Sequence, residues 1–210
     1  DMAGFIFVPW DNGQYSFHTN YARAWNLIGY ENNASTSFTD FGGLQLANIM
    51  FKSDGIGDGI SDFLDESIFF ASFAMSKTDP TNATHGMLGS NKSQTGHSYW
   101  LGVNTPDGFS NDGRFGLEWN KGSKYWRSFT YGEDTMVGSK VAARGTAWEL
   151  YYNKSLTKAL SSSIRFTKIT YDYSGSNGFF GNMGAPNDIN SNGAYVKEAQ
   201  NITGYIKYRF

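Results

Sequence analysis

Three histidines are the only side chains in this sequence that titrate near neutral pH, so a search for catalytic chemistry begins with them. A hydrolytic site needs a histidine beside a serine or an aspartate. Of His18, His85 and His97, His85 is the best candidate, because it lies in a polar stretch rich in Asn, Thr, Ser and Gly that reads as a surface loop. No Gly-x-Ser-x-Gly motif accompanies it. A surface-loop hydrolase therefore stays a hypothesis without a supporting motif, and no enzymatic activity is expected.

A second candidate for chemistry is an acidic, glycine-rich stretch that contains Asp54, Asp58, Asp62 and Asp65. Carboxylate and carbonyl oxygens are the ligands that calcium prefers. The spacing, however, lacks the alternate-position carboxylates of an EF-hand loop, and the glycine-rich unit does not repeat. The absence of cysteine also excludes thiolate metal sites and disulfides. We therefore expect a solvated turn with one helical turn in it, and no metal or other cofactor.

A third group consists of charged side chains that alternate with apolar ones in extended runs. Such alternation places the charges on one face of a strand and the apolar residues on the other. Inside a barrel the charged face would line a water-filled pore and bias which ions pass. The alternative is that the charges pair across neighbouring strands in a narrow or plugged lumen. The candidates are Arg114, Glu118, Glu149, Arg165, Lys207 and Arg209.

The clearest of these runs ends the chain. Ile202, Gly204, Ile206, Tyr208 and Phe210 share one parity, and polar residues occupy the other. This segment resembles the C-terminal signal strand of bacterial outer-membrane β-barrels, which ends in Phe after hydrophobic residues at every second position. The resemblance implies that Ile206, Tyr208 and Phe210 are read by the barrel-assembly machinery. An amphipathic edge strand of a soluble sandwich is the alternative.

The same alternation predicts nine strands along the chain. In 160–173 the apolar parity switches from Ile164 and Phe166 to Ile169 and Tyr171, which predicts a β-bulge near Lys168. The predicted strands are approximately 3–9, 15–28, 41–52, 67–78, 97–103, 115–126, 146–152, 160–173 and 195–210.

The lengths of the predicted connections alternate. Long connections fall at 29–40, 79–95, 127–143 and 174–194, and shorter ones at 10–14, 53–66, 104–112 and 154–159. Outer-membrane barrels have long loops on one side and short turns on the other, whereas a Greek-key sandwich follows no such rule. We therefore expect an all-β, antiparallel, up-and-down transmembrane β-barrel. The first strand would then run inward from outside, so residues 1–210 are expected to be the C-terminal part of a larger barrel domain, with at least one strand before Asp1.

Composition agrees with this expectation. The chain has 13 Tyr, 17 Phe and 6 Trp, and Tyr and Trp settle at membrane interfaces. Trp148, Tyr152, Tyr171 and Tyr173 are expected to form an interfacial aromatic girdle, the alternative being ordinary strand aromatics in a core. The net charge is -2 and no basic run occurs, which argues against nucleic acid as a partner.

Three stretches, 116–126, 139–145 and 171–176, resemble a porin-like outer-membrane β-barrel family of Gram-negative bacteria. The resemblance covers roughly the C-terminal half and implies location and architecture, without a catalytic motif. The expected function is an outer-membrane channel for passive diffusion of small hydrophilic solutes or ions. The expected partners are outer-membrane lipid, the assembly machinery, the solutes, and a second copy or a partner protein. A structural barrel with a plugged or partner-filled lumen is the alternative.

Overall fold

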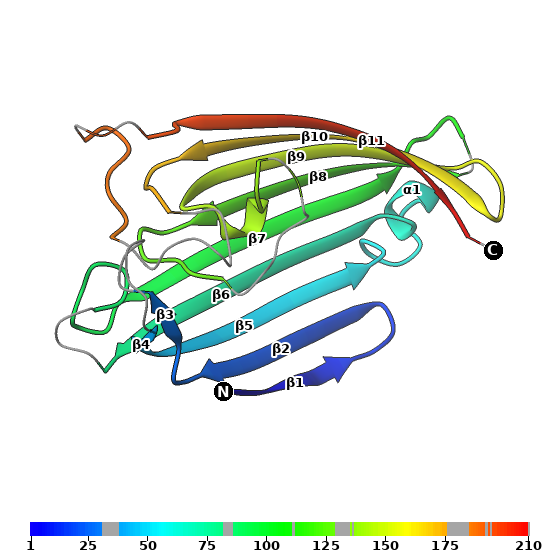
Figure 1. Cartoon of the computed structure of the whole chain (residues 1–210). Coiled ribbons are helices and arrows are strands. Elements are labelled where there is room, and N and C mark those ends of the chain that lie inside the picture. The colour runs from blue at the N-terminus through cyan, green and yellow to red at the C-terminus, as the bar shows by residue number, and fades with distance from the viewer. Residues whose placement is uncertain are drawn as a thin grey trace.

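Alternating apolar and polar residues form nine long strands, which pair in one antiparallel sheet (Figure 1). The computed structural model describes residues 1–30, 38–81, 86–110, 112–128, 135, 137–175, 185–191, 193 and 195–209. Each strand pairs with its neighbours in sequence, in the order β1-β2-β5-β6-β7-β8-β9-β10-β11. The bounds are β1 (Met2–Asp11), β2 (Tyr15–Ala24), β5 (Gly42–Asp54), β6 (Ile68–Pro80), β7 (Thr95–Pro106), β8 (Gly113–Gly122), β9 (Gly145–Ser155), β10 (Leu160–Tyr171) and β11 (Glu198–Tyr208).

This arrangement confirms the predicted all-β, up-and-down antiparallel sheet of nine strands. The sheet is open, with β1 at one edge and β11 at the other. A separate hairpin pairs β3 (Ile28–Tyr30) with β4 (Phe38–Asp40). The expected helical turn is α1 (Asp62–Asp65), and a short 3-10 helix, η1 (Lys140–Ala142), precedes β9. Within the described ranges, no helix has the length and apolar character needed to cross a membrane.

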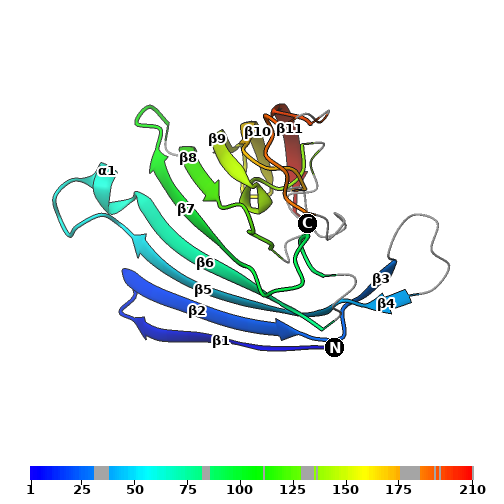
Figure 2. The same ribbon diagram turned by 90° about the vertical axis from the view of Figure 1, so that its left-hand side faces the viewer.

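Long and short connections lie at opposite ends of the sheet, as the spacing predicts (Figure 2). The long ones are 25–41, 81–94, 123–144 and 172–197, and we call that end the long-loop end. The short ones are 12–14, 55–67, 107–112 and 156–159, at the short-turn end. Adjacent strands of an antiparallel sheet run in opposite directions, so regular alternation of connection lengths puts all the long connections on one side.

The bulge predicted near Lys168 is wrong. The register of β10 runs without a shift from Leu160 to Thr170 against β11, and it is equally regular against β9. The apolar parity switches because Ile169 and Tyr171 pack on residues of the connection before β9. The apolar residues therefore change from one face of the strand to the other without any change in register. A register shift does occur in β1, between Phe7 and Trp10.

The sheet is curved, and the connection that contains η1 lies on its concave side (Figures 1 and 2). The buried apolar residues gather between this connection and the concave face, where Ala143 packs with Ala147 and Ile169. Nothing described covers the convex face: Ile206 is 72% exposed and Tyr208 63%. The described chain therefore lacks the second packed sheet that a soluble sandwich requires.

Two strand glycines leave room for aromatic rings on the concave face. A Cβ at Gly102 would meet the ring of Phe70, and a Cβ at Gly116 would meet the ring of Tyr151. Glycine inside a strand commonly marks such a close approach. The rings lie against the sheet wall and, with Trp100, border the polar site described below.

Candidate functional site

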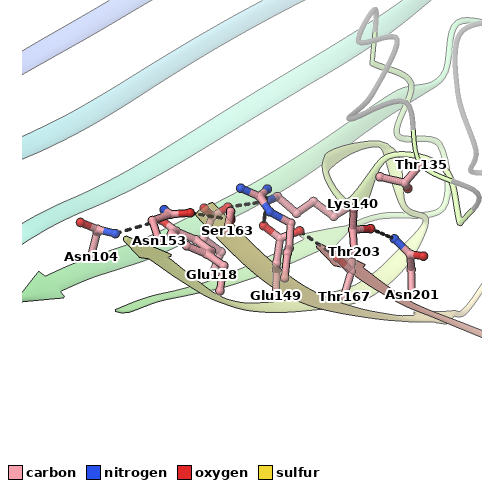
Figure 3. Close-up of polar contacts among 12 residues, drawn as sticks. Asn104, Glu118, Thr135, Lys140, Glu149, Asn153, Ser163, Thr167, Asn201 and Thr203 are labelled. Atoms are coloured by element: carbon pink, nitrogen blue, oxygen red, sulfur yellow. Dashed lines mark hydrogen bonds and ion pairs between the residues drawn. The ribbon is translucent and has the colours of Figure 1, made fainter. Parts of the chain in front are cut away.

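Four charged side chains meet on the concave face of β8–β10 (Figure 3). Glu118 of β8 is directly opposite Glu149 of β9, and Glu149 is opposite Thr167 of β10. Residues that are paired across antiparallel strands project from the same face. The strand register therefore brings the two carboxylates side by side, and a cation is needed between them.

Lys140 of η1 supplies that cation. Its Nζ lies 2.8 Å from Oε2 of Glu118 and 2.5 Å from Oε1 of Glu149. Arg165 of β10 donates to the same Oε1 of Glu149 at 2.8 Å, and the Thr167 hydroxyl donates to Oε2 at 2.8 Å. The indole of Trp100 donates to Glu118 at 2.9 Å. Among the residues that the structure describes, two carboxylates and two cations make the network electrically balanced.

The network is buried, so an unbalanced charge in it would be costly. Glu149 is 2% exposed, Lys140 4% and Glu118 8%. Burial by itself lowers the pKa of Lys140, but Glu118 and Glu149 outweigh this effect and raise it above its ordinary value of 10.5. A raised pKa means that the stabilisation from the charged lysine is present below pH 10.5 and is lost as pH rises through the higher, folded-state pKa. Lys140 therefore remains charged at all physiological pH values.

Local contacts place Lys140 over the concave face. The chain turns at Gly138, whose φ of +77° favours glycine, and its amide donates to the Thr135 carbonyl at 3.0 Å. The Trp126 indole donates to the Val141 carbonyl at 2.8 Å. Ala143 then packs against β9 and β10. These contacts hold η1 from both sides.

A second buried cation, Arg144, joins the long connections at the long-loop end. It is fully buried and donates to the Trp126 carbonyl at 3.0 Å and to the Ser174 carbonyl at 2.9 Å. Its own carbonyl accepts the amides of Asp172 and Tyr173. Desolvation, together with the nearby charge of Arg127, lowers the pKa of Arg144 to about 10. Arg144 thus ties the 123–144 connection to the 172–197 connection.

The other predicted pore-lining charges lie toward the short-turn end. Arg114 bonds neutral acceptors, the side chain and carbonyl of Asn104 and the carbonyl of Glu66. Lys207 is exposed and lies opposite Ser161, while Arg209 is exposed just beyond β11. The structure therefore brings Glu118, Glu149 and Arg165 together but leaves Arg114, Lys207 and Arg209 outside their network.

The predicted aromatic girdle divides between the two faces. Trp148 and Tyr152 are on the convex face, near Trp119 and Phe115 respectively. Tyr171 is on the concave face, and its hydroxyl donates to the Val137 carbonyl at 3.3 Å. Tyr171 cannot belong to a girdle on the convex face, because its side chain contacts the 137–143 segment on the opposite face.

Tyr173 lies beyond the end of β10, with the ammonium of Lys124 5.6 Å from its ring centre. In the predicted assembly signal, Ile206 and Tyr208 are both exposed on the convex face, and Phe210 lies outside the described residues.

Of the candidates for hydrolysis and for metal binding, those that the structure describes do not converge. His85 lies outside the described residues, while His18 contacts Ser16 on the concave face and His97 lies near Tyr99 on the convex face. The part of the chain that the structure describes contains no group of three or more His, Asp or Glu side chains able to hold a metal ion.

Asp107 anchors a turn at the short-turn end. Its carboxylate accepts the Ser110 hydroxyl at 2.6 Å, the Ser110 amide at 2.8 Å, the Phe109 amide at 3.1 Å and the Tyr152 hydroxyl at 2.9 Å. Desolvation raises the pKa of Asp107, but these hydrogen bonds together outweigh it and lower the pKa from 3.8 to about 2. The turn is therefore fastened to the convex end of β9.

This geometry predicts a titration. The stabilisation from ionised Asp107 should be present above pH 3.8 and disappear as pH falls through about 2. Carbon NMR of the labelled carboxyl should report a midpoint near pH 2, and Ser110→Ala should raise it toward 3.8, with Ser162→Ala as the control. A midpoint at 3.8 in the unmodified protein would contradict the hydrogen-bonded turn.

Sequence reasoning found Glu118, Glu149 and Arg165 but missed Lys140, Trp100 and Thr167. Lys140 lies in a connection, where no periodic pattern indicates the direction of a side chain. Trp100 and Thr167 lie on strands and share the face of the charged residues. Their polar groups could have been predicted to bond the charged side chains.

Comparison with known proteins identifies a family. The chain has no match among curated proteins and none among solved structures. One family model, described as "Protein of unknown function (DUF3373)", matches residues 1–210, which is the whole sequence. The chain therefore belongs to the DUF3373 family.

Proposed function

We propose that this chain is part of an outer-membrane β-barrel channel that allows passive diffusion of small hydrophilic solutes or ions. The observation that supports this proposal is the separation of apolar and polar side chains between the convex and concave faces of the sheet. From β6 to β11, one row of paired residues on the convex face is apolar: Phe69, Val103, Leu117, Leu150, Phe166 and Ile202. The adjacent row on the concave face contains Glu118, Glu149, Thr167 and Asn201.

The apolar row lies within a wider uncharged belt on the convex face. Along β6 the belt extends from Phe69 to Met75, on the order of 20 Å of strand at about 3.3 Å per residue. Charged convex residues begin beyond it, with Lys77 on β6, Lys121 on β8 and Lys168 on β10. Outer-membrane barrels carry an apolar band of about 25 Å, so this belt fits the lipid-facing surface of one.

The open edges support closure by further strands. All ten residues of β1 are exposed, including Phe5 at 60% and Ile6 at 82%. An apolar strand with a free edge is prone to pair with another strand, and closure into a barrel removes both edges. In the proposed barrel β1 and β11 pair with additional strands, and the exposed Ile206 and Tyr208 serve with Phe210 as the assembly signal.

A plugged structural barrel is the second candidate, and one observation favours it. Residues 137–143 lie on the concave face, where Ala142, Ala143 and Lys140 are buried against β8–β10. A segment in this position narrows or fills a lumen. Both candidates use the same architecture, so conductance separates them.

The test is electrical recording of the complete protein in planar lipid bilayers. A diffusion channel is expected to give steady ohmic steps after insertion, with a current proportional to voltage. Folded protein that inserts but remains silent would contradict the channel and favour the plugged barrel. Heat-modifiable gel mobility of the same sample establishes that a folded barrel was added.

A further inference from the structure

We propose that residues 137–144 form a constriction halfway along this channel and that Lys140 holds the constriction in place and sets its charge. The inference rests on the proposed channel function and assigns a positioning residue within it. It implies that removing Lys140 takes one positive charge away from the narrow region.

The depth of the contact supports a constriction. The segment belongs to a connection at the long-loop end, yet Lys140 reaches Glu118 and Glu149. These carboxylates adjoin Leu117 and Leu150, which lie in the middle of the uncharged convex stretches of β8 and β9, before Lys121 at one end and Lys154 at the other. A loop that only covered the rim would not extend to this depth.

The segment is attached by the ion pairs of Lys140 in its middle and by the hydrogen bonds of Val137, Val141 and Arg144 on either side. Its apolar packing on the strands is confined to a small cluster around Ala143, Ala147 and Ile169. Lys140, by contrast, contacts two carboxylates on two strands, and its ammonium lies 5.9 Å from the ring centre of Trp100. Loss of the lysine should therefore loosen η1 from the wall, while Val137 and Arg144 still hold the two ends of the segment.

The charges of the network predict the direction in which ion preference changes. Glu118 and Glu149 are balanced by Lys140 and Arg165. Replacing Lys140 with a neutral residue leaves one excess negative charge on the pore wall, which favours cations. Replacing Glu118 with glutamine leaves one excess positive charge, which favours anions.

The experiment uses the complete protein in planar bilayers with a KCl gradient. Lys140→Met is expected to raise single-channel conductance about twofold and to shift the reversal potential toward cation preference. Lys140→Met combined with Glu118→Gln should keep the raised conductance and restore the original preference. The matched control is Lys121→Met, which removes an exposed pair with Asp172 at 2.6 Å on the convex side, and it should change neither quantity.

A chemical rescue provides a second, independent readout. Because residues 1–210 contain no cysteine, Lys140→Cys introduces the one thiol of this part of the protein. Aminoethyl methanethiosulfonate transfers its aminoethylthio group to that thiolate and releases methanesulfinate, so a lysine-like cation is restored. Conductance should then fall back toward the unmodified value. The neutral methyl methanethiosulfonate should leave the cation preference in place.

The outcomes separate the two proposals. If the unmodified protein inserts but conducts no current, the proposed channel function is wrong. A conducting protein whose conductance and ion preference do not respond to Lys140→Met would overturn the constriction while leaving the channel intact. If Lys140→Met does not assemble, Glu118→Gln decides, because it keeps Lys140 paired with Glu149; a shift toward anions supports the proposal, and no shift overturns it.

Discussion

Replacing Glu149 with glutamine should lower the free energy of unfolding by about 3–5 kcal/mol, the cost expected when one partner of a buried ion pair is removed. Glu149 is 2% exposed and accepts from Lys140, Arg165 and Thr167. Glutamine keeps the shape of the side chain but removes its charge, so two cations would face Glu118 alone. Urea titration of the protein folded in lipid vesicles measures the loss.

An exposed ion pair serves as the control. Lys52 and Asp54 lie 2.6 Å apart with side chains 38% and 43% exposed, so Asp54→Asn should cost less than about 1 kcal/mol. Lys140→Met added to Glu149→Gln should cost less than the sum of the two single changes, since it removes the positive charge that Glu149 no longer balances. A loss below about 1 kcal/mol for Glu149→Gln would show that the network is solvated.

Replacing Leu150 with arginine should destabilise the membrane-inserted protein by about 2–4 kcal/mol, the cost of arginine on the lipid face at the middle of a bilayer. Leu150 is 53% exposed on the convex face, between Leu117 and Phe166 on the neighbouring strands. In water an exposed leucine would accept arginine almost without cost. The size of the effect therefore reports whether lipid covers this face.

The matched control lies on the same strand and the same face. Thr146 is opposite Lys121, close to the long-loop end, and Thr146→Arg should cost only about 0–1 kcal/mol, as expected near the interface. Folding efficiency into lipid vesicles and urea titration give both values. Equal effects at the two positions, or none at either, would contradict a convex face that spans a bilayer.

The strands could be predicted from sequence because a period of two is a local property. The alternation in 97–103, for example, predicts part of β7 (Thr95–Pro106), although the strand extends further at both ends. Regular alternation of connection lengths likewise predicted an up-and-down order. The predicted bulge near Lys168 was wrong because a change of apolar parity was interpreted as a change of register, when packing against a distant segment explains it.

The candidate site was predictable only in part. Glu118, Glu149 and Arg165 share a face because each lies on a strand of known parity. Their contact with one another depends on strand register, which no single strand reveals. Lys140 depends on the path of a connection, and the parity that suggested a girdle position for Tyr171 could not account for the Val137 carbonyl to which it donates.

By itself, the sequence determined the strand content, the order of the strands along the chain and the two-sided character of each strand, since alternation and connection length act locally. Only the tertiary structure decided which charges meet, because register and the inward path of residues 137–144 arise from contacts between segments far apart in the chain. Burial then required each of those charges to have a partner, since an unpaired ion in a poorly solvated site is costly.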